Sequence, residues 1–394
     1  MIRAFSLCGV LALVGNAYAE VELTGSAGFE QRYFLQDALY APQERTYSSV
    51  YLMPEIYTQW NGGADTLVVK PFYRIDEHDD ERTHGDIREF LWAHYADAWE
   101  TRVGIGKVFW GQTESLHLVD IINQTDSVES VDGEVKLGQP MVNVNYFSDY
   151  GMFSVYALPY FRERTFQGES GRLRPPVAIG DALYESDDEE RHLDIAIRWQ
   201  SSIADWEVGL SAFSGTTREP ELVTRLDQDG RPEILPFYAQ IDQIGIDVLK
   251  VSGAWLLKLE SIYRSGQSED FAALVTGFEY TKQGIWGSRY GLGVLAEYQY
   301  DERDSNFFAI GQNDLMTGLR VIVNDIAGTE VLFGFVQDLD ESSTYSGFVE
   351  ASSRLTENWS WTFNGYFFSS DDTEDPFFFL RRDDHVQFSL EYYF

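Results

Sequence analysis

The stretch His385-Val-Gln-Phe-Ser-Leu-Glu-Tyr-Tyr-Phe394 decides the fold class of this chain. In an extended strand, side chains alternate between two faces, so every second residue here is apolar and its neighbours are mostly polar. A strand at the edge of a soluble β-sandwich would leave this apolar face open to association with other chains. In a closed transmembrane barrel, the same strand meets lipid on one face and a wet lumen on the other. We therefore expect a transmembrane barrel in which this strand pairs with the first strand.

The terminal alternation also resembles the C-terminal signal of Gram-negative outer-membrane proteins. In those proteins, the barrel assembly machinery recognises a terminal Phe and the apolar residues that alternate before it. The resemblance implies that the assembly signal of this chain consists of Phe388, Leu390, Tyr392 and Phe394. It also implies the assembly machinery as a partner.

The first 19 residues read as a secretory signal peptide. Arg3 supplies the positive charge, residues 4–15 the apolar segment, and Ala17-Tyr18-Ala19 a cleavage site. Cys8, the only cysteine of the sequence, lies in this segment, so we expect neither disulfides nor thiolate metal sites in the mature protein. The expected organisation is a signal peptide over 1–19 and one barrel domain over 20–394, located in the cell outer membrane.

Charge and aromatic content narrow the class of protein. The sequence has 64 acidic and 29 basic residues, and its net charge of -35 excludes a nucleic-acid partner. Such acidity is also typical of disordered chains, but 27 Phe, 23 Tyr and 10 Trp residues supply ample apolar surface for a folded structure.

The alternation of connector lengths predicts the topology. Tight turns are expected around 61–63, 97–98, 149–151, 202–205 and 251–253, and longer, acidic segments separate them, such as 76–86, 110–138 and 163–190. In an outer-membrane barrel, short periplasmic turns alternate with long external loops in this way. The predicted fold is all-β: a single antiparallel transmembrane β-barrel of about 18 strands, or 14–16 if neighbouring segments merge.

A second resemblance involves the segments Ile87-Arg-Glu89, Trp99-Glu-Thr-Arg102-Val-Gly104, Trp110-Gly111 and Val119-Asp-Ile-Ile-Asn123, together with Asp126. This pattern, which covers about 40 residues, is similar to that of a family of uncharacterised porin-like outer-membrane proteins. The resemblance implies a porin-like barrel and says little about its solute.

The long connector 110–138 contains apolar residues at helical spacing, Leu116, Val119 and Ile122, which are misplaced in a loop surrounded by water. One interpretation is a loop folded into the lumen as a constriction; the other is an external lid. The candidate constriction residues are Trp110, Gly111, Glu114, Asp120, Asn123 and Asp126. With Glu129 and Asp132, the acidic members would give the constriction a negative side.

Basic residues on the predicted inner faces are candidates for pore lining and solute selection: Lys70, Arg74, Arg102, Arg198, Lys258, Arg264 and Arg320. Basic side chains opposite acidic loop residues would create a transverse field that sorts small polar solutes. The alternative is that these cations simply pair with luminal Glu260, Glu279, Glu297 and Glu391.

No pattern of residues indicates catalysis. None of the six histidines lies in an H-E-x-x-H motif, and no G-x-S-x-G motif is present, so we expect no enzyme, metal or cofactor. The sequence favours a porin-like channel for small polar or anionic solutes, as a monomer or homotrimer, in contact with outer-membrane lipids and lipopolysaccharide. The alternatives are a specific export or uptake channel for an acidic or hydrophobic compound, and a barrel hydrolase acting on lipids or polymers.

Overall fold

The computed structural model of the chain describes residues 20–226, 229–303, 311–373 and 375–394. The predicted signal peptide, with Cys8, therefore lies outside the described residues.

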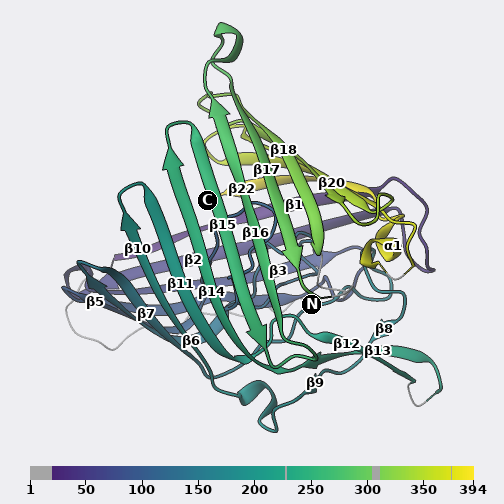
Figure 1. Cartoon of the computed structure of the whole chain (residues 1–394), viewed down its shortest axis with the longest axis horizontal. Coiled ribbons are helices and arrows are strands. Elements are labelled where there is room, and N and C mark those ends of the chain that lie inside the picture. The colour runs from purple at the N-terminus through teal and green to yellow at the C-terminus, as the bar shows by residue number, and fades with distance from the viewer. Residues whose placement is uncertain (1–19, 227–228, 304–310, 374) are drawn as a thin grey trace, which may run out of the picture.

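Within the described residues, 18 strands form one antiparallel sheet that closes on itself through the pair β1–β22. Figure 1 shows this barrel from the side. Its strands are β1 (Glu20–Phe34), β2 (Thr46–Trp60), β3 (Asp65–Asp76), β4 (Gly85–Tyr95), β5 (Trp99–Gly106), β6 (Gln139–Ser148), β7 (Gly151–Leu158), β10 (Asp194–Ile203), β11 (Trp206–Thr216), β14 (Gln240–Ser252), β15 (Trp255–Ser265), β16 (Phe271–Lys282), β17 (Gly291–Asp301), β18 (Asn313–Ile322), β19 (Glu330–Asp338), β20 (Tyr345–Arg354), β21 (Trp359–Ser369) and β22 (His385–Tyr393). The predicted fold class and strand number are confirmed.

From β1 to β15, the connectors between consecutive barrel strands alternate in length, as the sequence predicts. Short connectors such as 149–150 and 204–205 lie at one end, the turn end, and long ones such as 107–138 and 159–193 lie at the other, the loop end. Between β15 and β20 the alternation is lost, because the loop-end connector 266–270 is shorter than the turn-end connector 283–290. In Figure 1 the turns after β10 and β14 are at the upper left, whereas α1 (Pro376–Leu380) lies at the opposite side. Part of the long connectors forms a small second sheet of β8 (Ala178–Ile179), β9 (Leu183–Tyr184), β12 (Glu221–Leu226) and β13 (Pro232–Tyr238).

Short 3-10 turns complete the secondary structure: η1 (Asn61–Gly63), η2 (Glu189–Arg191) and η3 (Ile285–Gly287). In the described part of the chain, no helix is long and apolar enough to cross a membrane.

The last strand closes the barrel against the first. Phe29 pairs with Leu390 and Ala27 with Tyr392, and Gly25 and Phe394 exchange backbone hydrogen bonds of 3.1 and 3.0 Å. A glycine is required at position 25 because a Cβ there would lie 2.6 Å from the Cα of Pro54 and 2.8 Å from the carbonyl oxygen of Met53. The predicted pairing of the terminal strand is therefore confirmed.

The wall has two chemically different faces. On β10, Ile195 and Ile197 point outward and are 48% and 52% exposed, whereas Asp194 and Arg198 point inward and are buried. The same alternation places Tyr73 outside and Arg74 inside on β3. An apolar outer surface on a closed barrel suits the hydrocarbon of a bilayer, because every backbone group is satisfied within the sheet.

Candidate functional site

The connector between β5 and β6, residues 107–138, lies inside the barrel; we name it the luminal loop. Its residues Val119, Ile121 and Ile122 are at most 2% exposed. They belong to one apolar cluster with inward-facing residues of the wall, among them Phe213, Ile241, Ile262 and Phe271. These wall residues come from β11, β14, β15 and β16, so the loop fills that half of the lumen. Of the two interpretations of this segment, the structure shows the inward fold and not the external lid.

Asn123 joins the two ends of the luminal loop. Its side chain accepts a hydrogen bond from the Val108 N–H (2.9 Å) and donates to the carbonyls of Gly106 (2.9 Å) and Leu137 (2.8 Å). Since it is 1% exposed, the side chain fastens the loop from within and does not face a passage. Trp110 is also buried, at the base of the loop, where its ring packs edge-on against Tyr156 and beneath the Arg198 guanidinium.

A carboxylate on the wall holds the segment after Trp110. Glu260, from β15, accepts hydrogen bonds from the backbone N–H groups of Gln112 (2.6 Å), Thr113 (3.0 Å) and Val119 (3.3 Å). The Thr113 hydroxyl donates a fourth bond of 2.6 Å. A side chain at Gly111 would disturb this arrangement, because its Cβ would lie 2.9 Å from His117 Nδ1 and 3.1 Å from Glu260 Oε1. Hydrogen bonds to a buried carboxylate are strong, so Glu260 holds the segment 112–119 against the wall.

His117 adds a charged contact to the hydrogen bonds that Glu260 forms with the luminal loop. Its Nε2 lies 3.0 Å from Glu134, and its Nδ1 lies 3.9 Å from Glu260. Burial alone would lower the pKa of His117, but the hydrogen bonds and charges of Glu134 and Glu260 raise it to about 10. The imidazole is therefore a cation at neutral pH.

The next contacts of the loop are with β17 and β18. Glu297, from β17, accepts the N–H groups of Glu114 (2.8 Å) and Ser115 (2.8 Å). The Glu114 side chain in turn pairs with Lys258 (3.4 Å) and Arg320 (2.8 Å).

An arginine cluster holds the distal part of the loop against the opposite wall. Asp126 is fully buried and pairs with Arg88 at 2.6 Å, and Glu129 pairs with Arg74 at 2.8 Å. Arg82 pairs with Glu30 of β1 at 2.6 Å. Burial would raise the pKa of Asp126, but His84 and the Arg88 charge outweigh it and lower the pKa to about 2. The sequence analysis assigned no role to Arg82, Arg88 or Glu30. Of the three, Glu30 could have been placed on the inner face from the alternation of buried and exposed residues along β1.

Each predicted pore-lining cation has a carboxylate partner. The pairs not yet given are Lys70–Glu55 (2.5 Å), Arg102–Glu100 (2.7 Å), Arg198–Asp247 (2.8 Å) and Arg264–Glu219 (3.0 Å). Of the four carboxylates named as alternative partners, Glu279 and Glu297 lie near these cations, whereas Glu260 binds the loop. The charges of these cations are therefore largely neutralised by carboxylates of the protein itself.

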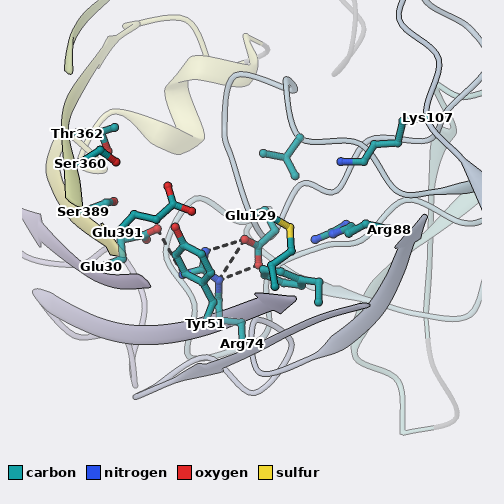
Figure 2. A pocket seen from close by; sticks show the side chains of 13 residues that line it. Glu30, Tyr51, Arg74, Arg88, Lys107, Glu129, Ser360, Thr362, Ser389 and Glu391 are labelled. Atoms are coloured by element: carbon teal, nitrogen blue, oxygen red, sulfur yellow. Dashed lines mark hydrogen bonds and ion pairs between the residues drawn. The ribbon is translucent and has the colours of Figure 1, made fainter. Parts of the chain in front are cut away.

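A cavity of about 260 Å³ separates the luminal loop from β1–β4, β21 and β22; we name it the Lys107 cavity. Figure 2 shows Lys107 and Arg88 on one side and Glu391 with Ser360, Thr362 and Ser389 on the other. Arg74 is the predicted cation that lines it. Among the described residues, the Lys107 ammonium has no ion-pair partner, and burial, followed by repulsion from Arg88, lowers its pKa. Sequence reasoning missed Lys107, since it lies just after β5 and outside the period-two pattern.

The Lys107 cavity continues towards the turn end. A second cavity of about 450 Å³ is lined by Ser360, Thr362 and Glu391 as well, and by residues 326–328 of the turn after β18. We name it the turn-end cavity. The three shared residues indicate that the two spaces adjoin.

A third cavity, of about 440 Å³, lies between the loop and β17–β21; we name it the Glu350 cavity. The loop contributes Glu114, Asp132 and Glu134 to its lining. Of the candidate constriction residues, Glu114 therefore faces a cavity, whereas Asp120, Asn123 and Asp126 are buried in contacts that hold the loop.

Across the described ranges, no group of three or more His, Cys, Asp or Glu side chains is arranged to hold a metal ion. His94 and His192 each contact a single aspartate, and His385 contacts a backbone carbonyl.

The solved structure of one porin shares this architecture. A BenF-like porin from Pseudomonas fluorescens superposes with a TM-score of 0.57 at 9% identity, covering 96% of this chain and 98% of that one. A loop-deletion mutant of OmpT, an outer membrane protein of Vibrio cholerae, has a TM-score of 0.48 at 10% identity, with 96% and 100% of the two chains covered. A mutant of Rh. blastica porin has 0.45 at 13%, with 95% and 100% covered.

At these identities, the likeness to the BenF-like porin shows the fold alone. No protein-family model matches the chain, and no curated protein matches its sequence. The porin-like family expected from residues 87–126 therefore stays a prediction.

Proposed function

We propose that this protein is a porin-like channel of the outer membrane, through which small polar solutes diffuse without a cofactor. The observation that carries the proposal is the one-sided filling of the lumen. The luminal loop packs on the wall from β11 to β16 and leaves cavities along β17–β22 and β1–β4. Solutes would follow this eccentric route, with the loop as the constriction.

The positions of the cavities along two strands support a continuous route. On β20, Glu350 lines the Glu350 cavity and Ser352, two residues nearer the turn end, lines the turn-end cavity. On β21, Tyr366 lines the former and Thr362 the latter. Because residues two apart on a strand share a face, these cavities are stacked along one side of the lumen.

Lys107 is the proposed determinant of charge selection. The seven cations expected to line the pore have carboxylate partners, whereas Lys107 faces the Lys107 cavity opposite Glu391 (Figure 2). A cation and a carboxylate on opposite sides create a transverse field, which orients polar solutes and attracts anions to one wall.

A substrate-specific channel is the second candidate. It is favoured by the extent to which the luminal loop fills the barrel, since ions would then pass slowly until a substrate displaces part of the loop. A barrel hydrolase has no such support. In the described residues, no serine hydroxyl is hydrogen-bonded to a histidine ring.

We infer the outer membrane as the location from the apolar outer face and the terminal strand. Phe388, Tyr392 and Phe394 are 44%, 38% and 43% exposed on the outside of the barrel, next to Leu390. These residues are the proposed signal for the barrel assembly machinery. Acidic loops at the loop end would face lipopolysaccharide outside the cell.

Planar-bilayer recording tests the proposal. Purified protein should give stable channels, and Lys107→Glu should shift the reversal potential in a salt gradient towards cation selectivity. Lys250→Glu is the matched control, because Lys250 packs on the Trp206 ring on the outer side of the wall and should leave selectivity unchanged. Folded protein without conductance would refute the diffusion channel, and conductance only after addition of a solute would favour the specific channel.

A further inference from the structure

The Glu350 cavity contains more negative charge than the protein neutralises. Glu114 is paired with Lys258 and Arg320, and Glu134 with His117. The remaining carboxylates of the lining are Asp132, Asp314 and Glu350.

These three carboxylates have no cationic partner within the described ranges. Asp132 accepts a hydrogen bond from the Tyr366 hydroxyl (2.8 Å), and Asp314 accepts one from the Asn313 N–H (3.3 Å). The Glu350 side chain forms no hydrogen bond or ion pair with any described residue. Carboxylates gathered in a partly enclosed space are stabilised by a cation, which would have to come from outside the chain.

The side-chain amide of Gln299 is a second observation, independent of the charges, that indicates a cationic ligand in this cavity. Gln299 lines the cavity and is 3% exposed, yet in the described part of the chain its side chain has no hydrogen-bond partner. It pairs across the sheet with Asp314, so an amide oxygen and a carboxylate lie side by side on neighbouring strands. Polar side chains that are this buried are normally hydrogen-bonded, and a ligand N–H group would satisfy the amide.

The rest of the lining is apolar and aromatic. Phe348 packs with Leu332 and Val336, and the rings of Phe368 and Phe377 are 5.7 Å apart. Such surfaces bury the body of an organic ligand, and aromatic faces attract cations. A hydrated metal ion would gain nothing from them.

We propose that the Glu350 cavity binds a small organic ammonium ion with an apolar body, whose N–H groups reach Glu350, Asp132 and Gln299 while its body packs on the phenylalanine rings. A volume of about 440 Å³ accommodates one aromatic amine. The inference concerns binding and stands apart from conductance.

The binding of an organic ammonium ion can be tested by isothermal titration calorimetry on the folded full-length barrel in an uncharged detergent. Three probes of similar shape are compared. Benzylammonium should bind, benzyl alcohol should bind at least tenfold more weakly, and benzoate should not bind. Glu350→Gln should weaken benzylammonium binding by roughly fivefold or more, the effect of one charge near 4 Å in a solvated site. The substitution removes no hydrogen bond or ion pair to a described residue, so the barrel should fold normally.

Glu391→Gln is the control, because Glu391 lines the Lys107 cavity and not the Glu350 cavity. Gln299→Leu provides a second variant and should also weaken benzylammonium binding. Equal affinities for the ammonium and the alcohol would overturn the proposal, as would an affinity unchanged in both Glu350→Gln and Gln299→Leu. Because no current is measured, these outcomes are separate from failure of the channel in bilayers.

Discussion

Replacing Glu260 with glutamine should loosen the luminal loop without opening the barrel wall. The carboxylate accepts four hydrogen bonds from the segment 112–119, three of them at Oε1 and one, from the Val119 N–H, at Oε2. In Glu260→Gln an amide oxygen can replace Oε1, but the amide NH₂ then faces the Val119 N–H.

The expected loss of docking free energy follows from the hydrogen bonds that the substitution weakens or removes. A charge-assisted hydrogen bond stabilises by roughly 1 kcal/mol more than a neutral one, and a buried donor left unpaired costs about 1–3 kcal/mol. Three weakened bonds and one unpaired donor give about 4–6 kcal/mol, which corresponds to a change of roughly a thousandfold or more in the ratio of docked to undocked loop. The strand ladder of β15 does not depend on this side chain.

Hydrogen exchange of the amides of Gln112, Thr113 and Val119 measures the docking directly, and single-channel recording measures its effect on the lumen. We expect faster exchange at these amides and larger, fluctuating conductance. Glu100→Gln is the matched control, because Glu100 is also buried on the inner wall but accepts hydrogen bonds from Arg102 and Asn145. If Glu260→Gln behaved as Glu100→Gln does in both measurements, the wall carboxylate would not be what holds the loop.

Three further perturbations follow from the same contacts. Asn123→Ala leaves three backbone groups of the loop ends without their hydrogen-bond partner, so the luminal loop should lose about 2–4 kcal/mol of docking free energy. Hydrogen exchange should then be faster at the amides of residues 108 and 124–125. Unchanged exchange at these amides would show that Asn123 does not fasten the loop. The pKa of His117 is raised to about 10, so its contribution to stability is complete below its unfolded value near 6.5 and is lost as the pH rises through 10. Exchange at 112–119, corrected for intrinsic rates, should therefore accelerate from pH 7 to 10.5 in the wild type and not in His117→Asn, and equal responses would refute this. The pKa of Asp126 is lowered to about 2, so its contribution is present above about 3.8 and is lost as the pH falls through 2. Asp126→Asn should destabilise the contacts of residues 126–129 by about 3 kcal/mol at pH 7 and by little below pH 2, and a difference independent of pH would exclude the proposed ion pairs.

The barrel itself could be predicted because its signals are local. Alternation of apolar and polar residues follows from strand geometry, and lipid outside and water inside convert that alternation into a closed wall. Leu390 and Glu391 show the rule within two residues: one contacts the outer face of β1, and the other lines the Lys107 cavity. The inward faces of Arg74, Arg198 and Lys258 follow from the same pattern.

Roles within the lumen depend on contacts between residues far apart in the chain. Glu260 and Gln112 are separated by 148 positions, and Asp132 and Tyr366 by 234, so no local pattern relates them. Asp120, Asn123 and Asp126 have the composition of a polar constriction, yet they hold the loop in place. Lys107, by contrast, lines a cavity in which the carboxylates of Glu30 and Glu129 are paired with arginines.

The sequence by itself therefore determined the closed barrel, the alternation of turns and loops, and the apolar strand that ends at Phe394, since each rests on the period-two geometry of a strand between lipid and water. Only the tertiary structure decided that residues 107–138 lie inside, which half of the lumen they fill, and which charges remain without a partner. The physical reason is that a charge acts through its neighbours in space, and in this barrel those neighbours come from nearby strands of the wall and from a loop distant in sequence.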